Sequence, residues 1–286
     1  SLGFLEIERK GTPGERRKSF FFYADKKKLA IEIPTVIWNF YLREAGFGMG
    51  FRYTLDAISA ADRATSIPKM ISALDEVSKT QGDLHKFSAW KPEVDGDRVT
   101  LALKGAIQVY PANKTWDEKA EEAAQNPFLF DLVAAIRSDF TLFMGLRGWV
   151  GTNYIDYLND KDGLRSNPGL RGYLYISAPQ KRLLARMIGD SKGYIGERIP
   201  ALAKGAPLRE ALQAIDWSAT LFIKPGLFHY ELGWPNQLVV RLMKEENMRV
   251  TVHGGMIFRA ADDGLLWAYN IEADAYFHFS GGLQLG

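Results

Sequence analysis

The chain has 286 residues, of which 47% are hydrophobic, 24% charged and 13% aromatic, and its formal net charge is +2. This composition excludes a disordered chain, and the length suffices for one large domain or two. The basic residues are dispersed, which argues against nucleic acid as a partner because that function needs a concentrated basic face. Cysteine is absent, so disulfides and thiolate metal sites are excluded, and an extracytoplasmic location is slightly favoured.

The first third of the chain predicts short strands followed by one helix. The strands are expected at 4–9, 19–24, 28–33, 36–42 and 47–55, with turns at Asp25-Lys26 and Pro34-Thr35. A helix is predicted over 66–80, where Ser66 is a suitable N-cap and the apolar residues recur at helical spacing. We expect the apolar side of this helix to cover the apolar face of a sheet.

The middle of the chain mixes strands and helices. Strict alternation predicts a strand over 98–110, two strands within 128–150 and a short strand over 172–177. An acidic helix is predicted over 116–124, and two amphipathic helices, each with proline near its start, over 179–188 and 207–215. The segment 159–169 is rich in Asn, Asp, Gly and Pro and predicts a loop.

The last third predicts an antiparallel meander with one apolar and one polar face. Its strands are expected at 219–224, 227–234, 238–244, 248–260 and 265–280. The register that separates the faces places Leu242, Val250 and Ala275 in one apolar row, and Val240, Val252 and Ala273 in another. The alternation continues to the last residues, so we expect a piece of a larger sheet protein. Its free edge would pair with the remainder of its parent chain or with a second copy.

The polar face of this meander carries the candidate metal ligands His253, Glu272, Asp274 and His278. Imidazole and carboxylate groups suit a divalent cation, although no standard ligand spacing occurs. The same register places Glu231 opposite Arg241, and Thr251 opposite Asp274. Cross-strand polar pairs of this kind stabilise a solvated sheet face, so structural pairing is favoured and no cofactor is predicted.

A second set of candidates lies in the strand that ends at Val150. Phe143, Arg147 and Trp149 share its polar face, and an aromatic ring beside a guanidinium suits contact with a sugar or a partner protein. Trp234 and Trp267 fall on the apolar face of the meander, which predicts that they pack in a core. The glycines of 46–50 lack the lysine of a phosphate loop and predict close backbone packing.

These patterns predict an α+β fold dominated by an antiparallel sheet, either open and curved or a partial barrel, with about three amphipathic helices packed on it. One domain over 1–286 is expected, and lobes at 1–112 and 127–286 are the alternative. No catalytic motif occurs, so the leading hypothesis is a non-enzymatic scaffold or interaction domain of a larger protein.

Two other functions fit parts of the sequence. One is a carbohydrate-binding or metal-binding domain, with or without hydrolytic activity, that uses the polar face of the meander. The other is part of an outer-membrane-type β-barrel, which the alternating strands and the aromatic residues suit. The predicted helices disfavour a membrane location, because helices that cover the apolar face would leave none of it for lipid.

Overall fold

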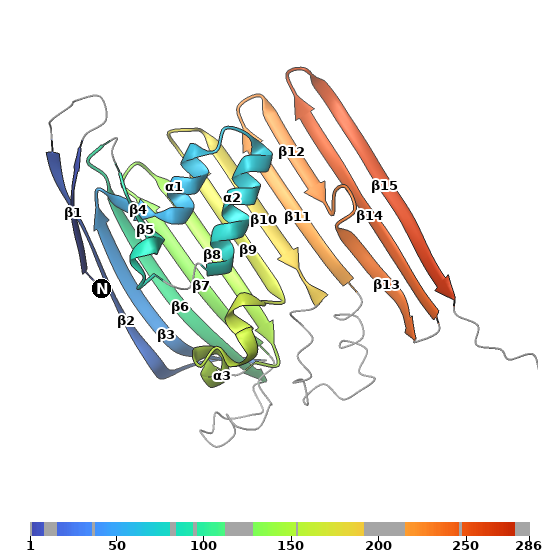
Figure 1. The fold of residues 1–286 in the computed structure, drawn as a ribbon, viewed down its shortest axis with the longest axis horizontal. Coiled ribbons are helices and arrows are strands. Elements are labelled where there is room, and N and C mark those ends of the chain that lie inside the picture. The colour runs from blue at the N-terminus through green and yellow to red at the C-terminus, as the bar shows by residue number, and fades with distance from the viewer. Residues whose placement is uncertain are drawn as a thin grey trace, which may run out of the picture.

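The computed structural model describes residues 2–8, 16–35, 38–80, 84–93, 96–111, 128–152, 154–191, 215–245 and 248–277. They form one 13-stranded antiparallel sheet, a two-stranded sheet and a small number of helices (Figure 1). The predicted fold class, an α+β fold dominated by an antiparallel meander, is confirmed. Among the described residues, no helix combines the length and the apolar character needed to span a bilayer.

Neighbouring strands of the large sheet follow one another along the chain, apart from the small sheet inserted after β3. The large sheet comprises β1 (Leu2–Glu8), β2 (Arg16–Pro34), β3 (Trp38–Phe51), β6 (Val99–Pro111), β7 (Phe128–Arg137), β8 (Thr141–Val150), β9 (Leu170–Ser177), β10 (Arg182–Gly189), β11 (Ile215–Lys224), β12 (Leu227–Leu232), β13 (Leu238–Glu245), β14 (Met248–Ala261) and β15 (Gly264–Phe277). The small sheet pairs β4 (Tyr53–Leu55) with β5 (Trp90–Pro92).

The strands β12 and β13 share one position in the sheet. Both pair with β14, and β11 pairs with both. Residues 233–237 therefore leave the line of the strand and return to it. Gly233 begins this excursion with a φ of +60°, and a Cβ on Gly255 of β14 would lie 2.3 Å from the Gly233 carbonyl oxygen. Glycine at both positions lets the excursion lie directly against the strand.

The helices α1 (Asp56–Arg63) and α2 (Ile67–Thr80) lie side by side on one face of the large sheet (Figure 1). They follow β4, and the short 3₁₀ helix η1 (Phe87–Ala89) precedes β5. The main core lies between these elements and the sheet, with Tyr53, Leu74, Trp90, Phe143 and Tyr175 almost fully buried. A smaller core lies under α3 (Tyr154–Leu158) and η3 (Lys161–Ser166).

Two of the predicted helices can be compared with the structure. The helix over 66–80 is confirmed as α2, and the Lys69 N–H donates to Ser66 Oγ at 3.4 Å. The helix over 179–188 is wrong, because these residues form a turn and β10. Leu184 is buried beneath the helices, whereas Leu183 lies on the other face. Apolar residues on both faces of this strand imitate a helical stripe. The segments 116–124 and 207–214 lie outside the described residues.

The N-terminal strands are longer than predicted. The strands expected at 19–24 and 28–33 are one strand, β2, and those at 36–42 and 47–55 belong largely to β3. The turn predicted at Asp25-Lys26 is therefore wrong. The polar residues there belong to a β-bulge, where the register with β3 shifts between Lys27 and Ile31 and Lys28 has a φ of 56°. The turn at Pro34-Thr35 is confirmed by the pairing of Pro34 with Asn39.

The predicted register of the meander is confirmed on β14 and β15. Val252 pairs with Ala273 and with Val240, and Val250 pairs with Ala275. Leu242 does not join that row, because a bulge shifts the register between Arg241 and Met243. The predicted pairing of Glu231 with Arg241 is wrong as well. Both residues occupy the same interrupted strand position, and Glu231 pairs with Thr220 and Ile257.

Candidate functional site

The two faces of the large sheet differ sharply in chemistry. On the face away from α1 and α2, which we call the outer face, one continuous row of paired residues crosses the sheet from β2 to β15. The members of this central outer row are Ala24, Phe47, Leu103, Ala134, Met144, Leu174, Ala185, Leu221, Tyr230, Phe258 and Trp267. The row contains no charged residue.

The rows on either side of the central outer row are equally apolar. One contains Met49, Leu101, Ile136, Leu142, Ile176, Leu183, Ile223, Phe228, Ala260 and Leu265. From β3 to β15 the other contains Ala45, Gly105, Leu132, Leu146, Gly172, Met187, Ala219, Leu232, Met256 and Tyr269, and its member on β2 is the exposed Lys26. Many of these side chains are exposed; Leu103, for example, is 58% exposed and Trp267 is 71% exposed.

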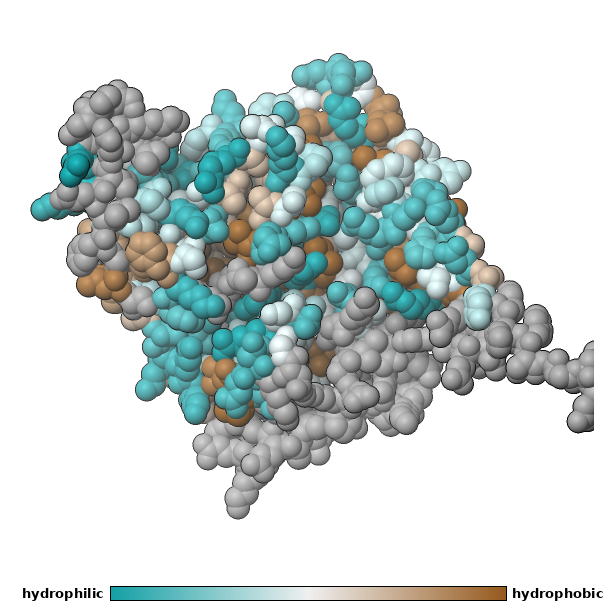
Figure 2. Space-filling model, in the orientation of Figure 1, coloured by the Kyte–Doolittle hydropathy of each residue, from teal (hydrophilic) through white to brown (hydrophobic). Residues whose placement is uncertain are grey.

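The opposite face, which we call the helix face, carries both buried apolar side chains of the main core and the polar and charged side chains of the same strands. Hydrophilic residues are spread over it between and around the helices (Figure 2). The buried Glu44, Lys104, Asp131, Arg137 and Arg147 all lie on this face, on adjacent strands. The expectation that the helices pack on apolar side chains of the sheet is confirmed, because Met70 and Leu74 of α2 share one buried cluster with Val133, Phe143 and Leu184. These helices do not cover the apolar rows of the outer face.

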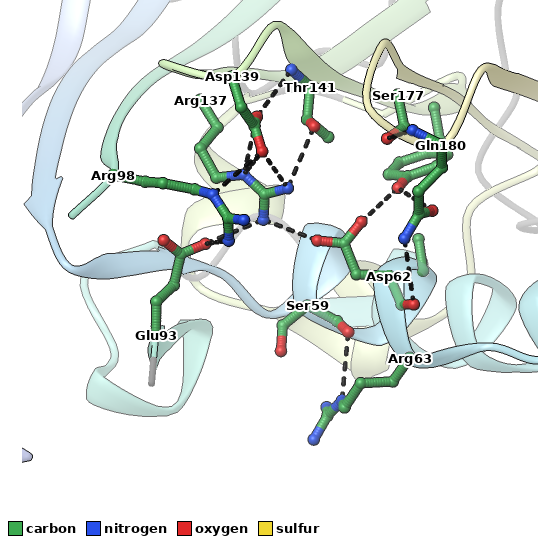
Figure 3. A network of polar contacts seen from close by, with 12 residues as sticks. Ser59, Asp62, Arg63, Glu93, Arg98, Arg137, Asp139, Thr141, Ser177 and Gln180 are labelled. Atoms are coloured by element: carbon green, nitrogen blue, oxygen red, sulfur yellow. Dashed lines mark hydrogen bonds and ion pairs between the residues drawn. The ribbon is translucent and has the colours of Figure 1, made fainter. Parts of the chain in front are cut away.

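Arg137, at the end of β7, lies at the centre of the largest group of polar contacts (Figure 3). Its side chain is 4% exposed, and Nη1 lies 2.7 Å from the Asp62 carboxylate of α1 and 2.9 Å from that of Glu93. Nη2 lies 2.8 Å from Asp139 in the β7–β8 turn, to which Arg98 also pairs at 3.2 Å. We call these five residues the Arg137 cluster. One guanidinium thus joins the sheet, its turn and the helix above it.

Two carboxyl groups of the Arg137 cluster have pKa values displaced in opposite directions. Burial opposes ionisation of Asp139, but hydrogen bonds from Arg137 and Thr141 outweigh it and lower the pKa of this carboxyl. Burial raises the pKa of Glu93, and the attraction of Arg137 and Arg98 does not fully offset it. The cluster therefore holds Asp139 in its ionised form more firmly than Glu93.

A second group of buried charges lies under α3 and η3. Asp131 on β7 and Arg147 on β8 are direct cross-strand partners and form an ion pair, and Tyr157 of α3 donates to Asp131 Oδ2 at 2.8 Å. Nearby, Lys104 pairs with Glu44 at 2.7 Å across β6 and β3. Buried charges of this kind persist only when they are paired and hydrogen-bonded.

Further polar contacts fasten the helices to the sheet. The Arg182 guanidinium of β10 donates to the carbonyl oxygens of Ala61 and Ala64 at the C-terminal end of α1, at 2.6 Å and 3.5 Å. Such a cation favours a helix C-terminus, where carbonyl groups lack intrahelical donors. Asp75 of α2 pairs with Arg186 of β10 at 3.2 Å. The helix face thus holds a fixed helical layer through charged contacts.

The predicted ligand residues Phe143, Arg147 and Trp149 do share one face of β8, and that face is the buried helix face. Arg147 pairs with Asp131, and the Trp149 Nε1–H donates to the Leu164 carbonyl oxygen at 2.7 Å. Arg147 and Trp149 therefore hold β8 against α3 and η3, and a ligand that touched them would have to displace those elements. Phe143 instead packs in the main core beneath α1 and α2.

The predicted metal candidates lie near one another without forming a cage. His253 pairs with Glu272 in register, and its Nε2 lies 3.2 Å from Asp274 Oδ2. His278 lies outside the described residues. Within the described ranges, no group of three or more acidic or histidine residues has a geometry suited to a metal ion.

The structure also locates the two tryptophans of the meander and the glycine-rich segment 46–50. Trp267 belongs to the outer face and is exposed, so the prediction that it packs in a core is wrong. Trp234 is also not on the apolar face: it belongs to the excursion 233–237 and lies at a pocket on the helix face. Gly48, in the glycine-rich segment, faces Trp90, and a Cβ there would lie 2.7 Å from that ring. Close backbone packing of these glycines is confirmed.

The Arg137 cluster was not identified in the sequence. Asp62, Glu93 and Arg137 lie far apart in the chain and share no motif spacing. For the second group of buried charges one signal was available, the charged Asp131 within the otherwise apolar segment 128–136. A charge on the buried face of a strand predicts a partner, but the partner is identified only by the pairing of the strands.

Comparisons with known proteins gave no match: no family model, no curated protein and no solved structure matches the chain. Function is therefore inferred from the chemistry of the two faces of the sheet.

Proposed function

We propose that this chain is part of a membrane-embedded β-sheet of the outer-membrane type. In this proposal the outer face contacts lipid, and the helix face lines an interior that α1 and α2 partly fill. The observation that carries the proposal is the central outer row with its two flanking rows, which cross the strands from β3 to β15 without a charged residue. Membrane sheets of this type place apolar residues outward and polar residues inward along each strand.

The lengths of the central strands support the proposal. The strands β7 and β8 each have 10 residues, and a tilted strand needs about 9–11 residues to cross the apolar part of a bilayer. In water, so extensive an apolar surface would be unusual, because monomeric soluble proteins rarely expose apolar patches above a few hundred Å². Contact with lipid would remove the unfavourable free energy of exposing this surface to water.

The polar contacts of the helix face also fit a membrane-embedded sheet. Charged groups inside such proteins face the interior and pair with one another. The pairs Lys104–Glu44 and Asp131–Arg147 follow this rule, because both lie on the helix face, away from the outer face. The proposal assigns them a structural role.

The apolar part of a bilayer contains no water, so every backbone N–H and C=O group there needs a partner within the protein. The proposal therefore requires further strands that pair with the sheet edges at β1 and β15. We propose that these strands come from the remainder of the parent chain or from a second copy of the same chain.

The scaffold function is the second candidate, and the free edge of β15 favours it. Within the described sheet β15 pairs only with β14, and its side chains at Trp267, Tyr269 and Ile271 are largely exposed. In this case another protein, instead of lipid, would cover the outer face and extend the sheet.

Single-cysteine labelling separates the two candidates, because the natural chain has no cysteine. Leu103→Cys on the outer face and Asp263→Cys in the β14–β15 turn would each carry a nitroxide spin label in phospholipid bilayers. We expect the label at residue 103 to be accessible to molecular oxygen and shielded from a water-soluble nickel chelate. The label at residue 263 should show the reverse, because Asp263 is exposed at a strand end.

Other outcomes decide against lipid contact. If the chelate reaches residue 103 as readily as residue 263, the membrane proposal fails. If the protein is monodisperse without detergent and its residue 103 is shielded from both reagents, a protein surface covers the outer face, which supports the scaffold.

A further inference from the structure

A pocket of about 550 Å³ lies on the helix face between α2 and the strands β10, β12 and β14. This volume is within the range of pockets that hold small organic ligands. The pocket is separate from the Arg137 cluster and from the outer face. Its walls come from α2 on one side, from the sheet on another, and from the excursion 233–237.

His229 is a buried polar residue in the wall of this pocket. The residue is 7% exposed and lines the pocket. Its Nε2 lies 2.8 Å from the Glu231 carboxylate, whereas its Nδ1 is buried without a hydrogen-bond partner among the described residues. Solvent does not reach this nitrogen, so a ligand in the pocket would meet the other atoms of the ring and the Glu231 carboxylate that pairs with it.

The charges around the pocket are mixed and nearly balanced. Three carboxylates line it, those of Asp75, Glu76 and Glu231, together with the two guanidinium groups of Arg186 and Arg259. Asp75 pairs with Arg186, and Glu231 with His229. No strong field of either sign remains to select an anion or a cation. Paired charges instead present donors and acceptors side by side, the pattern that hydroxyl groups match because each donates and accepts.

Trp234 adds an apolar surface to this polar lining. The excursion 233–237 brings its ring to the pocket, and Gln237 of the same excursion lies there as well. The excursion is fixed at its base, since the Gly233 N–H donates to the Ser218 carbonyl oxygen and the Gln237 N–H to that of Gly233, each at 2.7 Å. An indole ring beside hydrogen-bonding groups is suited to a ligand with one apolar face and a polar rim.

We propose that this pocket binds a neutral saccharide unit, with Trp234 against the ring face of the sugar and the hydroxyl groups bonded to the paired polar side chains that line the pocket, those of His229 and Glu231 among them. The inference stands apart from the membrane proposal, because the pocket lies on the face opposite the apolar rows. Failure of either one leaves the other intact.

The test is a titration of the purified full chain with neutral sugars, followed by saturation-transfer NMR. The probes are glucose, galactose, mannose, N-acetylglucosamine, maltose, cellobiose and lactose. We expect saturable binding of at least one probe at millimolar concentration or below. Trp234→Ala should weaken that binding by about tenfold, and Trp234→Phe should restore most of it because an aromatic face is retained.

Trp267→Ala is the matched control, since it removes an exposed tryptophan from the outer face and should leave the affinity unchanged. His229→Leu should also weaken binding while the melting temperature shows that the chain is folded. The proposal is overturned if no neutral sugar binds, if glucuronate or glucosamine binds more tightly than the neutral sugars, or if Trp234→Ala and Trp267→Ala have equal effects.

Discussion

The outer face and the helix face are built from the same strands, yet they obey different rules. Neighbouring residues Leu103 and Lys104 illustrate the contrast: the first is an exposed hydrophobic residue and the second a buried cation. In a protein surrounded by water these positions would be expected to exchange roles. The comparison teaches that alternation along a strand defines two faces, whereas the surroundings decide which face is buried.

The largest effect is expected from breaking the helix face at Arg137. Arg137→Met leaves Asp62, Glu93 and Asp139 near one another without the guanidinium that joins them. Removing one partner of a buried ion pair costs about 3–5 kcal/mol of the free energy of unfolding. Urea unfolding, in the medium in which the protein is monodisperse, would measure this loss.

The control for Arg137 is Arg259→Met. Arg259 pairs with Asp263 at 3.1 Å in a partly exposed position, where an ion pair contributes about 0–1 kcal/mol. Equal losses in the two variants would mean that the Arg137 cluster is no more than a surface network.

A charge placed on the outer face should have the next largest effect. Leu103→Arg lies in the central outer row, and arginine facing lipid near the middle of a bilayer costs about 2–4 kcal/mol. In water the same change at an exposed position would stay within about 0.5 kcal/mol. Unfolding in phospholipid bilayers distinguishes the two values.

Leu265→Arg gives the matched comparison on the same face, because Leu265 lies at the end of β15 beside its turn. Near the bilayer interface the cost of arginine falls to about 0–1 kcal/mol. A loss at residue 265 as large as that at residue 103 would contradict a depth-dependent lipid environment.

Adding one methyl group tests how tightly each face is packed. Gly48→Ala places a Cβ 2.7 Å from the Trp90 ring on the helix face, and overpacking of this kind costs about 1–3 kcal/mol. Gly105→Ala on the outer face meets nothing closer than 3.7 Å and should have little effect. Thermal unfolding of both variants compares the faces directly, and a larger loss for Gly105→Ala would reverse the contrast.

Lowering the pH should change the stability of the fold through the carboxyl groups of the Arg137 cluster. We expect these changes to be the smallest of those described. The pKa of Asp139 is lowered, so its ionised form stabilises the fold at neutral pH. That contribution is lost as the pH falls from the unfolded pKa of about 3.9 through the lower folded value. The pKa of Glu93 is raised, so protonation of Glu93 favours the fold as the pH falls through its folded value.

The two carboxyl groups therefore give single variants of opposite sign. Asp139→Asn should flatten the acid-induced loss of stability, and Glu93→Gln should steepen it. Melting temperatures recorded from about pH 7 to about pH 3 would show both slopes. If the melting temperatures of the two variants depend on pH in the same way, the opposite pKa shifts of Asp139 and Glu93 are contradicted.

The sequence predicted the alternation well because each strand carries its own pattern. The pairing of Val252 with Ala273 followed from keeping the apolar residues in register. The face of the sheet that the helices cover could not be predicted. The alternation within a strand does not show whether its apolar face contacts a core, a partner protein or lipid. The helix over 66–80 was recognised, and its apolar stripe packs on the sheet as expected, but the buried charges beside it could not be predicted from that stripe.

Candidate sites were harder to predict than strands. Arg147 and Trp149 were placed on one face of β8, as found, but their partners Asp131 and Leu164 lie on other elements. The first two residues of the excursion, Gly233 and Trp234, were placed at the end of the strand expected over 227–234, and so Trp234 was assigned to the apolar face. Only the pairing of both β12 and β13 with β14 reveals the interruption that brings Trp234 to a pocket.

The helical layer has a further consequence for how the chain folds. The segment from Arg52 to Arg98 is inserted between β3 and β6, which pair directly, with Phe51 opposite Val99. The pairs β7–β8, β9–β10, β11–β12 and β14–β15 are joined by short turns and can form locally. Joining β3 to β6 instead requires closing a long loop, an entropic cost that grows only slowly with loop length but delays the step. Because the same insert carries Tyr53, Leu74 and Trp90, we expect the main core to be complete only after this loop has closed.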